Sequence, residues 1–469
     1  MSTSKIDAWS TASLLDCADF VRGVTYTKSD AYTESNQNLV PLLRANNLQA
    51  GSFDLNDLVY VNKNIPSEQQ ILKQGDVVIA TSSGSLSVVG KAVQFFENEK
   101  LTFGAFCGVL RPSKIVDLRY FGHFFKSQAY RAAVSNLARG VNINNLKKDH
   151  FAEIQIPIAP IEEQRRIAEK LDTTLARVDT LNDRLARITP LLKRFRQSVL
   201  AAATSGRLTE DWRQNKDIST FSWKAITEFR EQILPDLPNS WKWVEFSEVA
   251  SVQSDLRDPS EYQNEIHLAP NHIEPWSGKI SGCQTIADDA VKSPKHWFNA
   301  GQIVYSKIRP NLCKVAIPNF SGLCSADMYP ISTKLNDSYL LLWMLGERFT
   351  SWASNAESRT VLPKINTKEL GKIPVPVTSA EEQTEIVRRV EILFAFADRL
   401  EARLQSAQTA AERLTPALLA KAFRGELVPQ DPSDEPAAEL LRRLREARAA
   451  DTASKPKRGR AAKAPTVSE

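Results

Sequence analysis

The stretch APIEEQRRI at positions 159–167 recurs in related form as SAEEQTEI at positions 379–386. The shared triplets Glu162-Glu163-Gln164 and Glu381-Glu382-Gln383 are 383 − 164 = 219 residues apart. The same separation, without a gap, relates further identical pairs, which are Ile154 and Ile373, Pro157 and Pro376, Leu185 and Leu404, Gly206 and Gly425, and Leu208 and Leu427. Solenoid repeats recur at much shorter periods, so this separation predicts a duplicated half-protein.

Each triplet is predicted to begin a long helix. Ser379 and Glu382 form a capping-box pattern, and Pro160 takes the place of the serine in the first copy, where a missing N–H costs nothing. The glutamates then fall in the first turn, where the positive end of the helix dipole favours them. Gly206 and Gly425 lie where a left-handed residue would end each helix.

Both helical segments carry a seven-residue apolar repeat, which is typical of a coiled coil. In the first copy the two series are Leu171, Val178, Leu185, Leu192, Val199 and Thr174, Leu181, Ile188, Phe195. In the second copy they are Val390, Ala397, Leu404, Ala411, Leu418 and Leu393, Leu400, Ala407, Leu414. Because the heptads match, we expect the two copies to pack on each other rather than on a helix of another protein.

Two prolines interrupt these runs. Pro190 and Pro416 stand at non-equivalent positions inside them. Proline lacks the N–H that an inner helical position needs, so we expect a kink or a break at each.

Composition excludes several classes of protein. The 469 residues exceed one ordinary core, so several domains are expected, and 42% hydrophobic with 25% charged residues is ordinary for a soluble protein. No apolar run reaches membrane-spanning length, and the start MSTSKIDAWS lacks the apolar core of a signal peptide. Five cysteines without a CxxC pair disfavour disulfides and zinc, which fits a reducing cytoplasm. The net charge of +5 permits nucleic-acid binding without demonstrating it.

Two mixed α/β stretches, 1–150 and 237–372, accompany the long helices and resemble each other weakly. LLRANNL (42–48) matches HLAPNHI (267–273), and QGDVVIATSSGS (74–85) matches AGQIVYSKIRPN (300–311). The apolar frame is shared, whereas Thr81-Ser82-Ser83 stands where Lys307-Ile308-Arg309 stands in the second copy. A common scaffold with different exposed residues predicts two modules that recognise different things.

Catalytic motifs are missing from the sequence. GSLSVVGKA (84–92) resembles a phosphate-binding P-loop, but its glycines are wrongly spaced and Ala92 has no hydroxyl for magnesium. The five histidines are scattered without metal-ligand spacing. The sequence therefore reads as that of a non-enzyme.

Polar clusters remain that suit recognition of DNA. Arginine can bond the edge of guanine, asparagine that of adenine, and serine, threonine and lysine can contact bases or phosphates. The candidate DNA contacts are Arg22, Thr25, Arg44, Asn46, Asn47, Thr81, Ser82, Ser83, Arg139, Asn142, Asn144, Asn145, Asn271, Lys307, Arg309, Asn311, Lys314 and Lys364.

Together these features resemble the specificity (S) subunit of type I restriction–modification enzymes over nearly the whole chain. The resemblance rests on the boundary written twice (IPIAPIEEQRRI and VPVTSAEEQTEI), the helix ends LAAATSGRLTEDWR and LLAKAFRGELVPQDPSDEPAAELL, and the opening LPNSWKWVEFSEVA at 237–250. RGVTY, LLRANNLQAG and IATSSGSLSVVGKA make the first domain similar to those of the type IA, K-like subfamily. The first domain departs from the family in its opening, where Trp9 stands without a clear LPxGW.

The resemblance implies an α+β, pseudo-twofold fold. Two homologous α/β target recognition domains would be separated by two long helices that form an antiparallel coiled coil. The implied parts are target recognition domain 1 (1–150), a first conserved helical region (151–210), a linker (211–236), target recognition domain 2 (237–372), a second conserved helical region (373–428), and an amphipathic helix with a basic disordered tail (429–469). The residues of both triplets, Glu162, Glu163, Gln164, Glu381, Glu382 and Gln383, are then expected at the helix starts and at a surface for partner subunits.

The resemblance also implies the partners. Each domain would read one half of a split, asymmetric site in double-stranded DNA. Two modification subunits would carry S-adenosylmethionine and methylate adenine N6, and two restriction subunits would use ATP and Mg²⁺ to translocate and cleave. This chain would be a non-catalytic cytoplasmic subunit without a cofactor or a metal of its own.

Two other functions stay open from the residues alone. One is a coiled-coil interaction scaffold without a role in DNA binding, which the heptads alone would support. The other is a nucleotide-binding enzyme built on residues 84–92.

Overall fold

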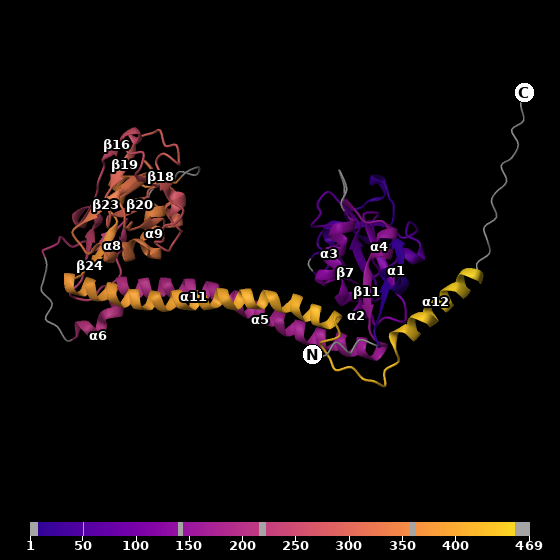
Figure 1. The fold of residues 1–469 in the computed structure, drawn as a ribbon. Helices are drawn as coiled ribbons and strands as arrows, with labels where there is room; N and C mark the ends of the chain where they lie inside the picture. The colour runs from indigo at the N-terminus through magenta and orange to yellow at the C-terminus, as the bar shows by residue number, and fades with distance from the viewer. Residues whose placement is uncertain (1–7, 50, 139–143, 215–221, 356–362, 455–469) are drawn as a thin grey trace, which may run out of the picture. The chain divides into compact units, whose positions relative to one another are not determined.

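The computed structural model describes residues 8–49, 51–138, 144–214, 222–355 and 363–454. The chain forms two compact units (Figure 1). Unit 1 consists of residues 1–184 and 407–469, and unit 2 of residues 185–406. Among the described helices, none is long and apolar enough to cross a membrane.

Unit 1 is built on two small sheets and a strand pair. The first sheet is antiparallel, with the spatial order β2 (Ala18–Arg22), β9 (Cys107–Pro112), β5 (Val77–Ala80) and β7 (Ala92–Gln94). The second has the order β4 (Val59–Asn62), β3 (Leu39–Leu43) and β8 (Thr102–Phe103), with β3 and β8 parallel. The pairs are β1 (Ser10–Ser13) with β11 (Gln155–Ile158), and β6 (Ser82–Ser83) with β10 (Asn144–Asn145).

Short helices cover these strands. They are α1 (Leu14–Cys17), α2 (Leu118–Phe124), α3 (Gln128–Leu137), α4 (Lys148–Glu153) and the 3-10 turns η1 (Lys28–Asp30), η2 (Ala45–Asn47) and η3 (Glu68–Gln70). The side chains of Tyr120, Phe121 and Phe124 on α2 are buried in the core.

Unit 2 repeats the same plan. Its antiparallel sheet has the order β15 (Ala250–Val252), β23 (Met328–Thr333), β20 (Ile303–Ser306) and β21 (Val315–Ala316). Its second sheet has the order β16 (Leu256–Arg257), β19 (Lys295–Phe298), β22 (Gly322–Cys324), β17 (Ile266–Leu268) and β18 (Gln284–Thr285), with β17 and β22 parallel. The strand pairs are β14 (Lys242–Glu245) with β24 (Pro374–Val377), and β12 (Glu228–Phe229) with β13 (Gln232–Ile233).

The helices of unit 2 also follow those of unit 1. They are α6 (Glu210–Arg213), α7 (Phe246–Val249), α8 (Asp337–Met344), α9 (Glu347–Ser354), α10 (Thr367–Gly371) and the 3-10 turns η4 (Arg207–Thr209), η5 (Pro259–Glu261), η6 (Pro270–His272) and η7 (Pro310–Leu312). The duplication that the sequence predicts is therefore present in the four-stranded sheets, in the parallel pairs β3–β8 and β17–β22, and in the pairs β1–β11 and β14–β24. Strands β12, β13, β16 and β19 have no counterpart among the described strands of unit 1.

Two long helices, α5 (Ile161–Thr204) and α11 (Ala380–Phe423), each contribute one half to each unit. In unit 1 the early part of α5, with Ile167 and Leu171, shares a core with Leu419 near the end of α11. In unit 2 the late part of α5, with Val199, shares a core with Val390 near the start of α11. The two helices thus pack on each other in antiparallel directions, as the fold class predicts.

The heptad positions differ in burial. The buried members of the first series on each helix are Leu171, Val178, Leu192, Val199, Val390, Ala397, Leu404 and Ala411. In the second series Leu181 and Leu414 are each 40% exposed, so the seam is tighter along one series than along the other.

The sequence predicts a kink or a break at each proline; neither helix is broken, and a kink stays a prediction. Helix α5 is continuous through Pro190, and α11 is continuous through Pro416. A proline removes only one backbone hydrogen bond, and apolar packing on both sides of it holds the remaining turns together.

The glutamine of each triplet binds the domain that precedes its helix. The side-chain carbonyl of Gln164 accepts the backbone N–H of Asp117, the N-cap of α2, at 2.9 Å, and its amide donates to the carbonyl of Ala159 at 2.8 Å. Gln383 makes the same two bonds at the same distances, to the N–H of Asn336 at the start of α8 and to the carbonyl of Thr378.

The second glutamate of each triplet accepts a tryptophan. The indole N–H of Trp9 donates to Glu163 at 3.0 Å, and that of Trp241 donates to Glu382 at 2.9 Å. Trp9 therefore occupies in unit 1 the place of Trp241 in unit 2, although the sequence around it differs. Burial raises the pKa of the Glu163 carboxyl, and the bond from Trp9 opposes that rise.

The prediction of a partner surface at the triplets is wrong for four of the residues. Glu163, Gln164, Glu382 and Gln383 are at most 3% exposed, because they bind strands and helices of their own unit. Glu162 and Glu381 remain at the surface.

A glycine stands two residues after the end of each long helix, at the base of one unit. Gly206 and Gly425 have φ angles of +76° and +70°, as the sequence predicts. A Cβ at Gly206 would meet the ring of Pro238 at 2.6 Å, and one at Gly425 would meet Trp9 at 3.3 Å.

The segment after α11 packs into unit 1, where the first described residues of the chain also lie. The N–H of Ala437, at the start of α12 (Ala437–Ser454), donates to the carbonyl of Ala8 at 2.9 Å. Arg166 on α5 pairs with the nearly buried Asp434 at 2.6 Å. The two ends of the described chain therefore complete one unit together. The predicted basic tail beyond Ser454 lies outside the described residues.

Replacing Glu382 by alanine is expected to destabilise unit 2 strongly. The fully buried carboxylate accepts bonds from Thr209, Arg213, Trp241 and Thr378, at 2.5–2.9 Å. Its loss leaves the Arg213 charge unpaired, which costs about 3–5 kcal/mol for a buried pair. Urea unfolding followed by tryptophan fluorescence reports mainly on this unit, because every tryptophan except Trp9 lies in it.

The matched control in the same unit and helix is Arg388→Ala. That side chain is 58% exposed and pairs with Glu385 of its own helix, so its loss should change the unfolding free energy by less than about 0.5 kcal/mol. Equal effects of the two variants would contradict the assigned role of the buried carboxylate.

Candidate nucleic-acid interface

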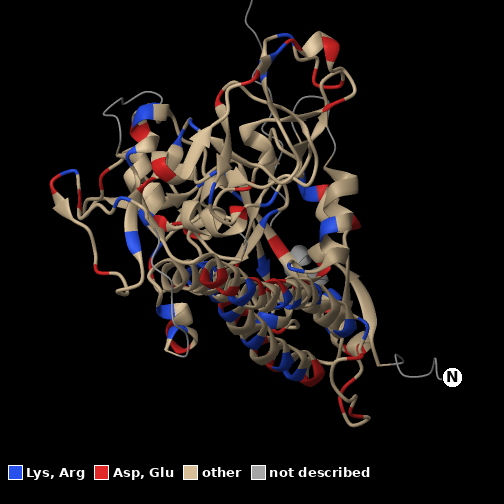
Figure 2. Cartoon of the chain, turned by 90° about the vertical axis from the view of Figure 1, so that its left-hand side faces the viewer, with Lys and Arg blue, Asp and Glu red and all other residues tan. Residues whose placement is uncertain are grey.

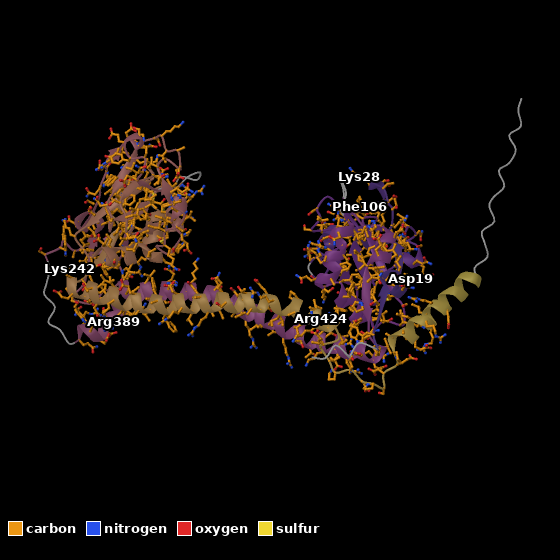
Figure 3. All side chains as sticks on the ribbon, in the orientation of Figure 1. Asp19, Lys28, Phe106, Lys242, Arg389 and Arg424 are labelled. Carbon is orange, nitrogen blue, oxygen red and sulfur yellow. The ribbon has the colours of Figure 1, made fainter. Side chains whose placement is uncertain are left out.

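Most of the predicted DNA contacts gather where the parallel strands of each unit end. We define tip 1 as residues 22–25, 44–46, 82–83, 106 and 144–145 of unit 1. We define tip 2 as residues 271, 307–309, 327 and 363–364 of unit 2. Figure 3 shows Phe106 and Lys28 at the end of unit 1 that lies away from α5.

Three crossing segments hold tip 1 together. The carbonyl of Phe106 accepts the N–H groups of Thr81 at 2.9 Å and Ser82 at 3.3 Å. The carbonyl of Thr81 in turn accepts the N–H of Leu146 at 2.7 Å, directly after β10. Loops from β5, β8 and β10 are thereby fixed side by side.

Two further segments join the same point. The N–H of Val24 donates to the carbonyl of Phe103 at 2.7 Å, and the N–H of Gly104 donates to that of Leu43 at 2.9 Å. Gly23 lies so close to Gly104 that a Cβ at position 23 would stand 2.0 Å from the Gly104 oxygen. The close approach of residues 23 and 104 therefore requires a glycine at position 23. The same backbone bonds bring Arg22, Thr25 and Arg44 to the tip.

Tip 2 is held by the corresponding bonds. The N–H of Lys307 donates to the carbonyl of Asp327 at 3.0 Å, and the N–H of Ile365 donates to that of Lys307 at 2.9 Å. The N–H of Ser325 donates to the carbonyl of Leu268 at 2.9 Å, as Gly104 does to Leu43. The isolated bridge between Ile308 and Lys364 stands where β6 pairs with β10.

This correspondence identifies positions that share a backbone but differ in chemistry. Thr81 corresponds to Lys307, Ser82 to Ile308, Ser83 to Arg309, Phe106 to Asp327 and Asn145 to Lys364. Tip 1 is neutral and partly aromatic at these positions, whereas tip 2 is mainly cationic. The two tips therefore cannot present the same surface.

Several predicted contacts are exposed, with no side-chain bond to another described residue. They are Arg22, Thr25, Asn145, Asn271, Arg309, Asn311 and Lys364. Arg309 has a φ of +46°, a left-handed backbone conformation that residues other than glycine rarely adopt. Its backbone N–H is fixed to the carbonyl of Pro363 at 2.8 Å, so the loop holds this conformation.

Other predicted contacts are engaged within the protein. The Arg44 guanidinium binds Asp57 at 2.8 Å, and the Asn46 amide reaches the same carboxylate at 3.3 Å. The Lys307 ammonium donates to the carbonyl of Ala326 at 2.7 Å and lies over the ring of Tyr329. Asn144 donates to the carbonyl of Gly84 at 3.4 Å, so these side chains are held in place at the surface.

Three predicted contacts do not hold in this structure. Asn47 is 1% exposed, and its amide binds the carbonyls of Asp54 and Asp57 while its oxygen accepts the N–H of Arg44. Thr81 is buried, and both of its backbone polar groups are bonded. The half-buried Lys314 donates its ammonium to the carbonyl of Pro270 at 2.5 Å, next to Asn271, so it supports that turn. Arg139 and Asn142 lie outside the described residues.

Sequence reasoning missed Phe106 and Asp327. Both are exposed, and they occupy corresponding positions at the end of β8 and β22. In the alignment that pairs Phe106 with Asp327, TFGAFCGV and GLCSADMY share only Ala105 and Ala326, which is too little to align them, so the backbone bonds reveal the match. Exposure of Phe106 reaches 67%, which a hydrophobic residue in a β-rich segment does not predict.

The electrostatics of the tips follow their residues. In tip 1 Asp57 offsets the charge of Arg44, and Ser82, Ser83 and Asn145 are neutral. In tip 2 burial lowers the pKa of the nearby His296 imidazole, and the positive charge of Lys307 lowers it further.

The glycine-containing loop 84–92 is not a phosphate cradle. The Arg131 guanidinium donates to the carbonyls of Leu86, Ser87 and Val89 at 2.7–3.1 Å. A phosphate site needs free N–H groups pointing at the anion, whereas this loop turns its carbonyls toward a cation. In the part of the chain that the structure describes, no group of histidine, cysteine or acidic side chains is placed to hold a metal.

Comparison with known proteins agrees with this architecture. The family described as "Type I restriction modification DNA specificity domain" matches residues 6–189 and 238–407. The EcoDI specificity subunit of Escherichia coli is 49% identical over 69% of this chain and 76% of its own length. The EcoKI specificity subunit of Escherichia coli K12 is 35% identical over 98% of this chain and 99% of its own length. The StySPI specificity subunit of Salmonella potsdam is 35% identical over 97% and 98%.

Solved structures share the fold. A chain from a study of complex assembly in the type I R-M system has a TM-score of 0.62 at 15% identity, covering 89% of this chain and 98% of its own. The HsdS subunit from Thermoanaerobacter tengcongensis has a TM-score of 0.54 at 16% identity, covering 90% and 98%. With two matched domains on one chain and relatives aligned over its whole length, the chain belongs to the family of type I restriction–modification DNA specificity subunits.

Proposed function

We propose that tip 1 and tip 2 read the two different halves of a bipartite, asymmetric DNA sequence. The chain is the sequence-recognition subunit of its system, and methylation and cleavage belong to other subunits. The observation that carries the proposal is the duplicated set of backbone bonds that presents different side chains in the two units. A duplicated frame with divergent ends is what a reader of two unlike half-sites requires.

The parts of the chain take separate roles in this proposal. Residues 1–150 and 237–372 form the recognition domains, and 151–210 and 373–428 form the conserved helical regions that set the spacing. The described parts of segments 211–236 and 429–469 contact the long helices at the bases of the two units, where Arg389 binds Asp211 and Arg166 binds Asp434 at 2.6 Å each.

The partners follow from the family. We infer assembly with two modification subunits, which bring S-adenosylmethionine and methylate adenine N6, and two restriction subunits, which use ATP and Mg²⁺. This chain itself binds no cofactor in the proposal and works in the cytoplasm. The exposed faces of α5 and α11 remain as docking surfaces, with Glu162 and Glu381 at their starts, and Figure 2 shows both signs of charge interspersed over these helices.

The chemistry of tip 2 favours guanine in its half-site. Arg309 is exposed and unpaired among the described residues, and the guanidinium fork matches the O6 and N7 acceptors of guanine. Lys364 lies beside it through the bridge to Ile308. Tip 1 offers Ser83 and Asn145 at the corresponding positions, which suit hydrogen bonds to adenine or to phosphates.

Arg309→Ala is expected to relax specificity in one half-site only. Removing a bidentate contact to guanine should cost about 1–3 kcal/mol on the cognate duplex and little on duplexes that already carry a mismatch at that base pair. The measurement is fluorescence anisotropy of the full chain with its modification subunit, using duplexes that carry the methylated site of the host genome and single base-pair changes in each half.

The control for this variant is Arg348→Ala. Arg348 is exposed on α9 and lies in a pocket with Gln197 of α5. It should leave discrimination unchanged. Uniform weakening by Arg309→Ala on all sequences, with a reduced salt dependence, would make Arg309 a phosphate contact instead.

A second pair of variants distinguishes a residue that stabilises tip 1 from a residue that contacts DNA. Asn47→Ala removes a buried side chain that binds three backbone groups, so the unfolding free energy should fall by about 1–3 kcal/mol. Asn46→Ala removes an exposed neighbour, so stability should change by less than about 0.5 kcal/mol while affinity for the first half-site falls. Thermal unfolding and DNA binding of both variants test this, and a stability loss in Asn46→Ala alone would reverse the assignment.

A further inference from the structure

The most exposed aromatic ring of the described chain belongs to tip 1. Phe106 is 67% exposed, and its ring makes no aromatic or cation–π contact with another described residue. Single exposed apolar residues are common on protein surfaces, so exposure alone does not mark a site. What distinguishes Phe106 is its place in tip 1, beside the candidate DNA contacts Ser82, Ser83 and Asn145.

The backbone that carries Phe106 is rigid. Its carbonyl accepts two N–H groups, from Thr81 and Ser82, and the N–H of Cys107 closes a tight turn onto the carbonyl of Gly104 at 2.8 Å. The following strand β9 begins at the buried Cys107. The ring therefore projects from a fixed point and would lose little freedom on binding.

The corresponding position in unit 2 carries a different chemistry. Asp327 is exposed, and its carbonyl accepts the N–H of Lys307 as that of Phe106 accepts the N–H of Thr81. The backbone bond is the same at both positions, whereas the side chain changes from a phenyl ring to a carboxylate. Since the fold accepts either side chain, its chemistry is free to serve binding.

The edges of base pairs offer few partners to an apolar ring. In the major groove the edges present hydrogen-bond donors and acceptors, and the apolar group among them is the C5 methyl of thymine. The residues around Phe106 in tip 1, which are Ser82, Ser83 and Asn145, suit the polar groups of neighbouring bases.

We propose that Phe106 selects thymine in the half-site read by tip 1 by packing its ring against the C5 methyl group. The inference rests on the proposed function of tip 1 and adds to it one base and one chemical group. At the corresponding place in tip 2, Asp327 would not respond to a methyl group, so the selection is confined to one half-site.

Deoxyuridine tests this directly, because it lacks only the methyl group of thymine. Each thymine of both half-sites is replaced in turn, and the affinity of the full chain with its modification subunit is measured by fluorescence anisotropy. One replacement in the first half-site should weaken wild-type binding about fourfold, which corresponds to about 0.8 kcal/mol for one buried methyl-sized group. Phe106→Ala should bind the thymine and deoxyuridine duplexes equally.

Control variants separate the possible outcomes. Phe96→Ala removes another exposed ring of unit 1, which lies beside Arg119 and His123 away from tip 1, and it should keep the wild-type response to deoxyuridine. Thermal unfolding of Phe106→Ala should match that of wild type, because the ring is mostly in water.

Three results would overturn the proposal. The first is a wild-type protein that responds to no deoxyuridine in the first half-site, the second is a response that persists in Phe106→Ala, and the third is a loss of affinity in that variant without a change in base preference. Equal loss of affinity for all sequences in Phe106→Ala would make the ring a stacking wedge instead. Failure of the proposed function itself is distinguishable, because the wild-type complex would then bind the site no better than an unrelated duplex.

Discussion

The arrangement of each unit depends on a buried carboxylate that receives an indole N–H at the start of a long helix. Glu382 binds Trp241 directly before β14, Thr378 directly after β24, and Arg213 of α6, which follows the other long helix. One side chain thus ties three segments that are far apart in sequence. Glu163 does the same for Trp9 with fewer partners, and one of its oxygens has no bond within the described residues. Since both recognition folds are fixed to their helices through these groups, the direction in which each tip points is set here.

The sequence predicts the duplication, the two long helices and their mutual packing, because each is written as a period along the chain. It also predicts the left-handed conformations of Gly206 and Gly425. Their spacing after the heptad runs is enough for that prediction. Burial of the triplets escapes such reasoning, since an acidic first turn is ordinarily exposed. Gln164 and Glu382 are buried by partners far away in the sequence, such as Asp117 at 47 residues and Thr209 at 173 residues. For the same reason the prolines do not break the helices, because tertiary packing outweighs one lost bond.

Neighbouring polar residues near the tips differ in burial, and the local sequence does not show which of them is buried. Asn47 and His272 hold corresponding positions, and each accepts the N–H of the residue three places earlier, Arg44 or Ala269. Both are buried, whereas their neighbours Asn46 and Asn271 are exposed. Polar residues at a turn therefore include one that builds the turn and one that is presented by it. Phe106 is the converse, because a residue type expected in a core stands in water where two backbone bonds hold it.

The bond between Ala437 and Ala8 bears on how the protein is made on the ribosome. Unit 2 is one continuous run of chain, residues 185–406, and all of its partners have emerged once that run has been synthesised. Unit 1 needs residues from both sides of that run, so its first 184 residues must wait for the last part of translation. At roughly 5–20 residues per second this wait lasts tens of seconds. The part of the protein that is translated first is thus the last to acquire its native base.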